Sequence, residues 1–154
     1  MHAEFDTADA FRSTPNEIST PRVMTSSPDS KTILVADDCA PVGELIELLL
    51  CRVGYRVLRA TNGADALRLA RKTRIDLLLS NLDMPKMRGD ELAVRFAAIH
   101  PAAPVVFLSS FDHPDEVSEP LDVLTKPFTV AELRDTVSHA LRQRAALPTV
   151  AQAA

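Results

Sequence analysis

The sequence has few cysteines, no tryptophan and no excess of positive charge. Its two cysteines, Cys39 and Cys51, are too few for a disulfide framework, and no histidine lies at metal-ligand spacing from either of them. The formal net charge of -4 argues against a nucleic-acid-binding surface, because neutralising phosphates requires a basic face. We therefore expect two reduced cysteines and no nucleic-acid partner.

Long apolar runs are also missing. No run approaches the roughly 20 residues that a membrane helix needs, and residues 1–30 lack the basic-then-apolar pattern of a secretory signal. We expect a cytoplasmic protein with no membrane partner. Residues 1–30, rich in Ser, Thr, Asp and Pro, and the Ala-rich residues 145–154 predict disordered tails. One folded domain is left, over residues 31–144.

Five short apolar segments alternate with helical patterns along this domain. The predicted strands are residues 32–36, 55–60, 76–81, 104–108 and 123–125, and the predicted helices are residues 41–53, 62–73, 90–99 and 129–144. Such alternation predicts an α/β fold, a doubly wound parallel sheet with helices on both faces. In the first helix, Leu45 and Val53 share a predicted core face with Val42, Ile46 and Leu49. The acidic segment 111–122, which contains two prolines, predicts a shortened or irregular fourth helix.

Polar side chains stand where four of the strands end. They are Asp37-Asp38, Asn81, Ser109 and Lys126. Each alone is explained by capping or by an ordinary loop, but four at successive strand ends indicate a site, because ligands bind outside the carboxyl ends of parallel strands. Two carboxylates suit a hard cation such as Mg²⁺, and a hydroxyl with an ammonium group suits phosphoryl oxygens. A nucleophile is missing, because an amide such as that of Asn81 is neutral and weakly nucleophilic.

In these residues the chain resembles the receiver domain of two-component response regulators, over about residues 31–144. The resemblance lies in the acidic pair, residues 84–89 (Met-Pro-Lys-Met-Arg-Gly), Ser109 and residues 126–128 (Lys-Pro-Phe), in the family's order. It implies a flavodoxin-like fold with strand order 2-1-3-4-5 and phosphoryl transfer from a histidine kinase. It also implies Mg²⁺ at Asp37 and Asp38, with a backbone carbonyl from the position of Asp83. Ser109 and Lys126 would be the switch hydroxyl and the phosphoryl-binding lysine, and the bond before Pro127 would be cis.

The chain departs from this family at several positions. Asn81 stands where the family has its phosphoacceptor aspartate, and Val123 stands at the switch aromatic position. Losing a carboxylate predicts weakened Mg²⁺ binding, because ligand charge sets affinity at such sites. Lys86 and Arg88 replace the usual glycine and acid of the loop. One hypothesis is that either of them forms a salt bridge with Asp37 or Asp38 in place of the metal.

The resemblance implies a single-domain receiver in phosphorelay signalling, one that is not an enzyme. We expect it to dock to a histidine kinase, a phosphotransfer protein or another signalling protein without phosphorylation at Asn81, through helix 41–53 and residues 126–128. One alternative is a conventional receiver phosphorylated on Asp38 or Asp83. A more distant alternative is a small Mg²⁺-dependent phosphohydrolase. The sequence leaves the oligomeric state open.

Overall fold

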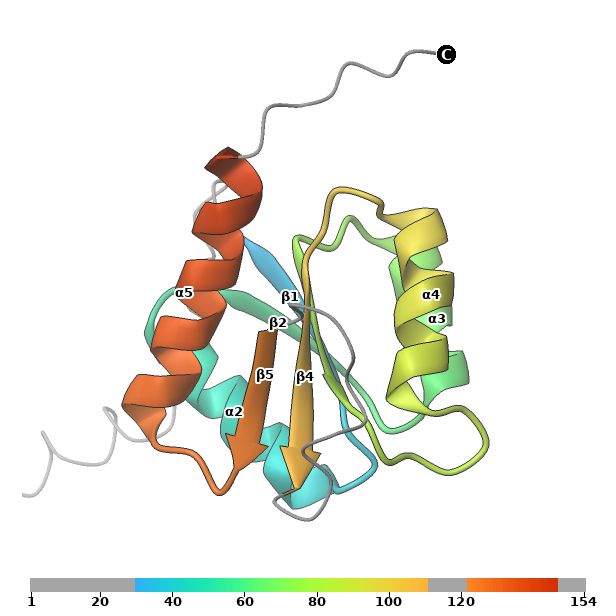
Figure 1. Ribbon diagram of the computed structural model, residues 1–154, viewed down its shortest axis with the longest axis horizontal. Helices are drawn as coiled ribbons and strands as arrows, with labels where there is room; N and C mark the ends of the chain where they lie inside the picture. The colour runs from blue at the N-terminus through green and yellow to red at the C-terminus, as the bar shows by residue number, and fades with distance from the viewer. Residues whose placement is uncertain (1–29, 111–121, 147–154) are drawn as a thin grey trace, which may run out of the picture.

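The computed structural model describes residues 30–110 and 122–146 (Figure 1). Its elements, in chain order, are β1 (Thr32–Ala36), α2 (Ala40–Arg52), β2 (Arg56–Ala60), α3 (Gly63–Lys72), β3 (Leu77–Asn81), α4 (Gly89–Ile99), β4 (Val105–Ser110), β5 (Asp122–Lys126) and α5 (Val130–Ala146). The predicted tail at residues 1–29, the tail after residue 146 and the predicted irregular helix lie outside the described residues.

The five strands form one parallel sheet in the order β2-β1-β3-β4-β5. This confirms the predicted α/β class and the flavodoxin-like strand order. All five residues of β1 are buried, and so are the first four of β3. These two strands are central and covered on both faces, which explains why their sequences are apolar runs without polar alternation.

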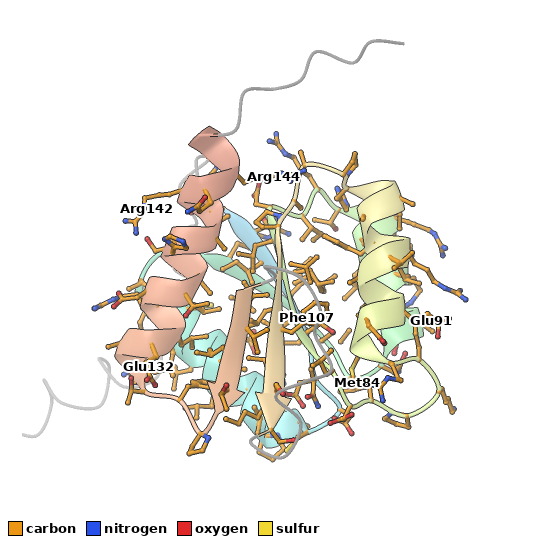
Figure 2. All side chains as sticks on the ribbon, viewed as in Figure 1. Met84, Glu91, Phe107, Glu132, Arg142 and Arg144 are labelled. Atoms are coloured by element: carbon orange, nitrogen blue, oxygen red, sulfur yellow. The ribbon has the colours of Figure 1, made fainter. Side chains whose placement is uncertain are left out.

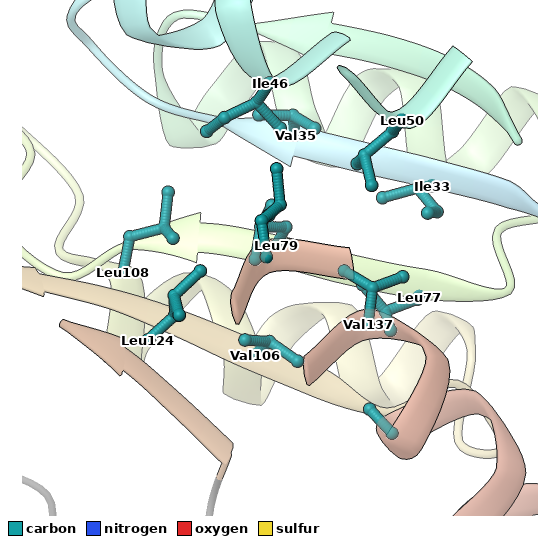
Figure 3. Packing of buried hydrophobic residues seen from close by; sticks show 12 residues of the cluster. Ile33, Val35, Ile46, Leu50, Leu77, Leu79, Val106, Leu108, Leu124 and Val137 are labelled. Carbon is teal, nitrogen blue, oxygen red and sulfur yellow. The ribbon is translucent and has the colours of Figure 1, made fainter. Parts of the chain in front are cut away.

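Helices cover the two faces of the sheet in pairs. Successive strand residues point to opposite faces, so Ile33 and Val35 pack with α2 and α5, whereas Leu34 and Ala36 pack with α3 and α4. Figure 3 shows the first of these two cores, with side chains of β1, β3 and β4 meeting α2 and α5. This three-layer arrangement holds the strand ends rigidly and so fixes the residues that follow them.

The helix ends follow the signals in the sequence. The side chain of Asn62 accepts a hydrogen bond from the backbone N–H of Asp65 and caps α3. Thr129 and Glu132 form the predicted capping box at the start of α5, with reciprocal bonds of 2.7 and 3.1 Å. The last helix extends to Ala146, two residues beyond its predicted end. None of the helices within the described ranges is long and apolar enough to cross a membrane.

The predicted core face of α2 was partly wrong. Leu45 is 51% exposed and Val53 is 48% exposed, whereas Ile46 and Leu50 are fully buried. The helix rests on only one edge region of the sheet, over β1 and β2, and its buried stripe is therefore narrower than the apolar pattern predicts. The consequence is an apolar patch of Leu45 and its neighbour Leu48, which is 50% exposed, on the outer surface of α2.

Candidate functional site

The candidate site lies at the carboxyl ends of β1 and β3. These strands are neighbours at the centre of the sheet, and Ala36 of β1 lies in register with Ser80 of β3. The next residues, Asp37 after β1 and Asn81 at the end of β3, therefore lie side by side at this edge of the sheet. This is the point where the strand order reverses, so the chain diverges to both faces and opens a crevice there.

Asp37 is the buried anion of the site. Its Oδ1 accepts a hydrogen bond of 2.9 Å from the backbone N–H of Cys39, and its Oδ2 lies 3.0 Å from Nζ of Lys126. The side chain of Asp37 is completely buried and that of Lys126 is 25% exposed. Burying a carboxylate is costly unless it is paired and hydrogen-bonded, so Lys126 neutralises the acid that the fold holds inside. The peptide bond between Lys126 and Pro127 is cis.

Asn81 lies between two acceptor oxygens. Its Nδ2 donates to Oδ1 of Asp38 at 3.0 Å and to the backbone carbonyl of Asp83 at 3.1 Å. One amide nitrogen with two N–H groups thus connects the loop after β1 to the loop after β3. No buried side-chain nitrogen or oxygen in the described ranges lacks a hydrogen-bond partner. Among the described residues, the side chains of the site thus satisfy one another by hydrogen bonds and an ion pair, although Asp38 is exposed.

Gly89 is a site residue whose role the sequence reasoning missed. A Cβ at this position would lie 2.2 Å from the backbone oxygen of Asn81 and 2.9 Å from Cα of Leu82. The N–H of Gly89 donates to the Leu82 carbonyl at 2.9 Å, which brings the start of α4 against the end of β3. The sequence signal for this role is the position of Gly89 at the end of the Met-Pro-Lys-Met-Arg-Gly segment, directly before the predicted helix 90–99.

Two predicted site residues take no part in this network. The hydroxyl of Ser109 is buried but donates to the backbone carbonyl of Ser110, at 3.1 Å. Val123 lies on β5, at the edge of the sheet, and is 39% exposed. The strand ends thus bring together Asp37, Asp38, Asn81 and Lys126, with the carbonyl of Asp83, and leave Ser109 and Val123 outside their hydrogen bonds.

The loop between β3 and α4 has its own charge arrangement. Arg88 lies 3.7 Å from the carboxylate of Asp83 and 3.5 Å from that of Asp90. Lys86 adopts a φ of 71°, the left-handed region that glycine occupies without cost. The salt bridge that neutralises Asp37 comes from Lys126 on β5, whereas the sequence hypothesis had assigned such a bridge to this loop.

The family of this chain is identified by a match that includes these site residues. Residues 33–138 match the family described as "Response regulator receiver domain". The chain belongs to this family. Receiver domains partner with histidine kinases and phosphotransferases in two-component systems, and they typically bind Mg²⁺. The finding covers the whole sheet and all four described helices up to the last turns of α5.

Curated relatives agree with this membership. The chain is 32% identical over 113 residues to sporulation initiation phosphotransferase F of Bacillus subtilis, which covers 70% of this chain and 91% of that protein. It is 34% identical over 131 residues to the transcriptional regulatory protein PrrA of Mycobacterium leprae, and these cover 82% of this chain. The chain spans 56% of PrrA and 27% of the GlrR regulatory protein of Escherichia coli.

Solved structures show the same fold. A receiver domain protein from Clostridium thermocellum superposes with a TM-score of 0.70 at 26% identity, over 77% of this chain and 99% of that one. The receiver domain of the hybrid histidine kinase CckA superposes with a TM-score of 0.63 at 31% identity, over 71% of this chain and 98% of that one. Both likenesses place the carboxyl strand ends of this chain in a receiver framework.

With the Asn81 amide in this orientation, the site offers Mg²⁺ fewer free oxygen ligands than a carboxylate at position 81 would. A cation needs oxygen ligands, but the Asp38 carboxylate and the Asp83 carbonyl both face the N–H groups of Asn81. In the described ranges no group of three or more His, Cys, Asp or Glu side chains is gathered closely enough to hold a metal. The amide thus takes the place of a cation between these oxygens.

Proposed function

We propose that this protein is a receiver in which Asn81 occupies the phosphoacceptor position, and that it signals by docking to a partner without phosphorylation there. The supporting observation is the pair of hydrogen bonds from Asn81 Nδ2 to Asp38 and to the Asp83 carbonyl. The central side chain of the pocket is neutral and is held as a hydrogen-bond donor, so it offers no oxygen nucleophile to a phosphorus atom. We further propose that the chain is not an enzyme, that it is cytoplasmic and that it binds Mg²⁺ weakly.

A conventional phosphorelay role, with the phosphoryl group on Asp38 or Asp83, is the competing proposal. The Asp38 carboxylate is engaged by Asn81, and the Asp83 side chain is half-exposed beside Arg88. Neither acid contacts Lys126, whose ammonium group is directed to Asp37. A phosphoryl group on either acid would therefore lack the neutralising cation that such transfer needs. A Mg²⁺-dependent phosphohydrolase is disfavoured further, because such a reaction needs the metal as well.

Intact-mass measurement after incubation with acetyl phosphate and Mg²⁺ tests this proposal. The wild-type chain should gain no phosphoryl group, whereas Asn81→Asp supplies a carboxylate and should gain one. Asn81→Ala separates the alternatives: a stoichiometric adduct on both the wild-type chain and Asn81→Ala would place the phosphoryl group on another acid and contradict the proposal.

Docking through α2 is the second part of the proposal. Leu45 and Leu48 are half-exposed on the outer side of this helix, and Phe128 after β5 is packed against the core beside it. Neighbouring exposed leucines on a helix surface are a candidate protein contact. Because Leu45 is exposed, it can be replaced without opening the core, which makes it a usable probe of docking.

The docking test compares two matched substitutions. Leu45→Asp adds a charge to α2, and Val94→Asp adds one to α4, where Val94 is 74% exposed. Binding to a purified histidine phosphotransfer protein or to the phosphotransfer domain of a histidine kinase should fall at least about tenfold with Leu45→Asp, the loss of one buried apolar contact. It should be unchanged with Val94→Asp. Equal binding by both variants would overturn the assignment of α2.

A further inference from the structure

A second site lies at the opposite end of the sheet, near the amino ends of the strands. Four segments that are far apart in sequence line a cavity of about 340 Å³: Lys31 before β1, residues 74–76 before β3, residues 99–104 between α4 and β4, and Leu141 with Arg144 on α5. This volume is within the range of about 300–1,000 Å³ that is typical of small-molecule sites. None of the residues of the candidate functional site lines it.

The rim of this cavity is positively charged although the whole chain carries a net charge of -4. Three cations line it, Lys31, Arg74 and Arg144, against one carboxylate, that of Asp76. That carboxylate is already engaged, because its Oδ2 accepts a hydrogen bond of 2.8 Å from the backbone N–H of Thr32 and its Oδ1 lies 3.8 Å from Arg74. An excess of positive charge is therefore available to a ligand.

Arg144 reaches from α5 to the loop between α4 and β4. Its guanidinium donates from Nε and Nη2 to the backbone carbonyls of Ala102 and Pro101. Figure 2 shows Arg144 on the side of α5 that faces the loop between α4 and β4, whereas Arg142 points to the other side. A guanidinium has five N–H donors, and its other donors have no partner among the described residues. A pre-positioned guanidinium binds an oxyanion with little loss of side-chain freedom.

The floor of the cavity is apolar. Ile75 is buried, and Ile99 and Leu141 are half-buried along it. An apolar floor with a few convergent charged groups is the usual composition of a small-molecule site. We propose that this cavity binds a small amphiphilic anion, in which a carboxylate or phosphate group meets Arg144 and Lys31 and an apolar body lies on Ile75, Ile99 and Leu141.

Titration of the full chain with 1-naphthyl phosphate, by calorimetry and by backbone amide shifts in NMR spectra, tests this site. Neutral 1-naphthol and inorganic phosphate alone should each bind at least about tenfold more weakly, because each lacks one of the two kinds of contact. The shifted amides should be those of residues 74–76 and of Ile99, His100, Ala102 and Ala103, since Pro101 and Pro104 have no backbone N–H. Equal binding of 1-naphthol, or shifts confined to the surroundings of Asn81, would overturn the proposal.

Matched variants locate the ligand on the rim. Arg144→Gln should weaken binding of 1-naphthyl phosphate at least about tenfold, the effect of losing a charge-assisted contact. Arg142→Gln, two residues earlier on the other side of α5, should leave it unchanged. Lys31→Gln is a second rim variant that leaves α5 intact and should weaken binding in the same direction. If both rim variants bind as the wild-type chain does, the cavity is not the site.

Discussion

The two ends of the sheet differ in whether their charged side chains are paired within the protein. At the carboxyl end, Asp37 is paired with Lys126 and Asp38 with the amide of Asn81, so the polar groups satisfy one another. At the amino end, Lys31 and Arg144 border a cavity and have no acidic partner among the described residues. At the carboxyl end the charged groups are paired within the protein, whereas at the amino end these two cations are available to a ligand. Disturbing the first should cost stability, and disturbing the second should not.

The largest expected effect comes from Gly89→Ala. The new Cβ would meet the backbone oxygen of Asn81 at 2.2 Å, and backbone cannot move as a flexible side chain can. We expect a loss of about 2–3 kcal/mol in the free energy of unfolding, the upper range for overpacking. Urea unfolding followed by circular dichroism measures it. Gly43→Ala is the control, since its Cβ meets only the Arg59 side chain at 3.7 Å and should be neutral or stabilising; an equal loss in both variants would contradict the close approach.

The next effect is that of Lys126→Met, which removes the cation beside the fully buried carboxylate of Asp37. We expect a loss of about 1–3 kcal/mol, less than for a completely buried pair because Lys126 retains some exposure. The double variant with Asp37→Asn should recover part of this loss. Urea unfolding of the two single variants and the double variant gives the coupling energy. Strict additivity would show that the pair does not stabilise the fold.

At the amino end, Arg74→Gln should change the free energy of unfolding by no more than about 0.5 kcal/mol. The Arg74 side chain is 86% exposed, and its contact with Asp76 is long, at 3.8 Å. The same urea experiment measures it. A loss as large as that of Lys126→Met would remove the contrast between the two ends.

The smallest expected effect is a difference in reactivity between Cys39, which precedes α2, and Cys51 in α2. Cys39 precedes the helix at the carboxyl end of the sheet and is exposed, whereas Cys51 in the last turn is half-buried. Burial raises the pKa of the Cys51 thiol, and the nearby carboxylate of Glu47 raises it further. A raised pKa leaves less thiolate at pH 8, so iodoacetamide should modify Cys39 first, as peptide mass mapping over time would measure. Faster modification of Cys51 would contradict this.

Much of the fold could be predicted from the sequence because local patterns carry it. The apolar runs of β1 and β3, the Asn62 cap and the Thr129 capping box each act over a few residues. The side of α2 that faces the core could not be predicted fully. Leu45 fits the apolar period of the helix, but its exposure depends on how much of the helix surface the sheet covers.

The candidate site could likewise be predicted only in part. Its polar residues could be predicted because each follows a strand, and parallel strands end at the same edge of a sheet. The bonds among them could not. That Asn81 donates to Asp38 and to the Asp83 carbonyl, and that Lys126 is directed to Asp37, depends on the register between β1 and β3 and on the approach of α4 at Gly89.

By itself the sequence determined that a neutral amide stands among the acids at the strand ends, because the residue types are read directly from the sequence. Only the tertiary structure decided that this amide is held as a donor between two oxygens, and that a cationic cavity lies at the other end of the molecule. The physical reason is that these contacts join residues that are far apart in the sequence. The segments that line the cavity become neighbours only when the sheet and its helices pack: residue 31, residues 74–76, residues 99–104 and residue 144. No local sequence pattern predicts these contacts.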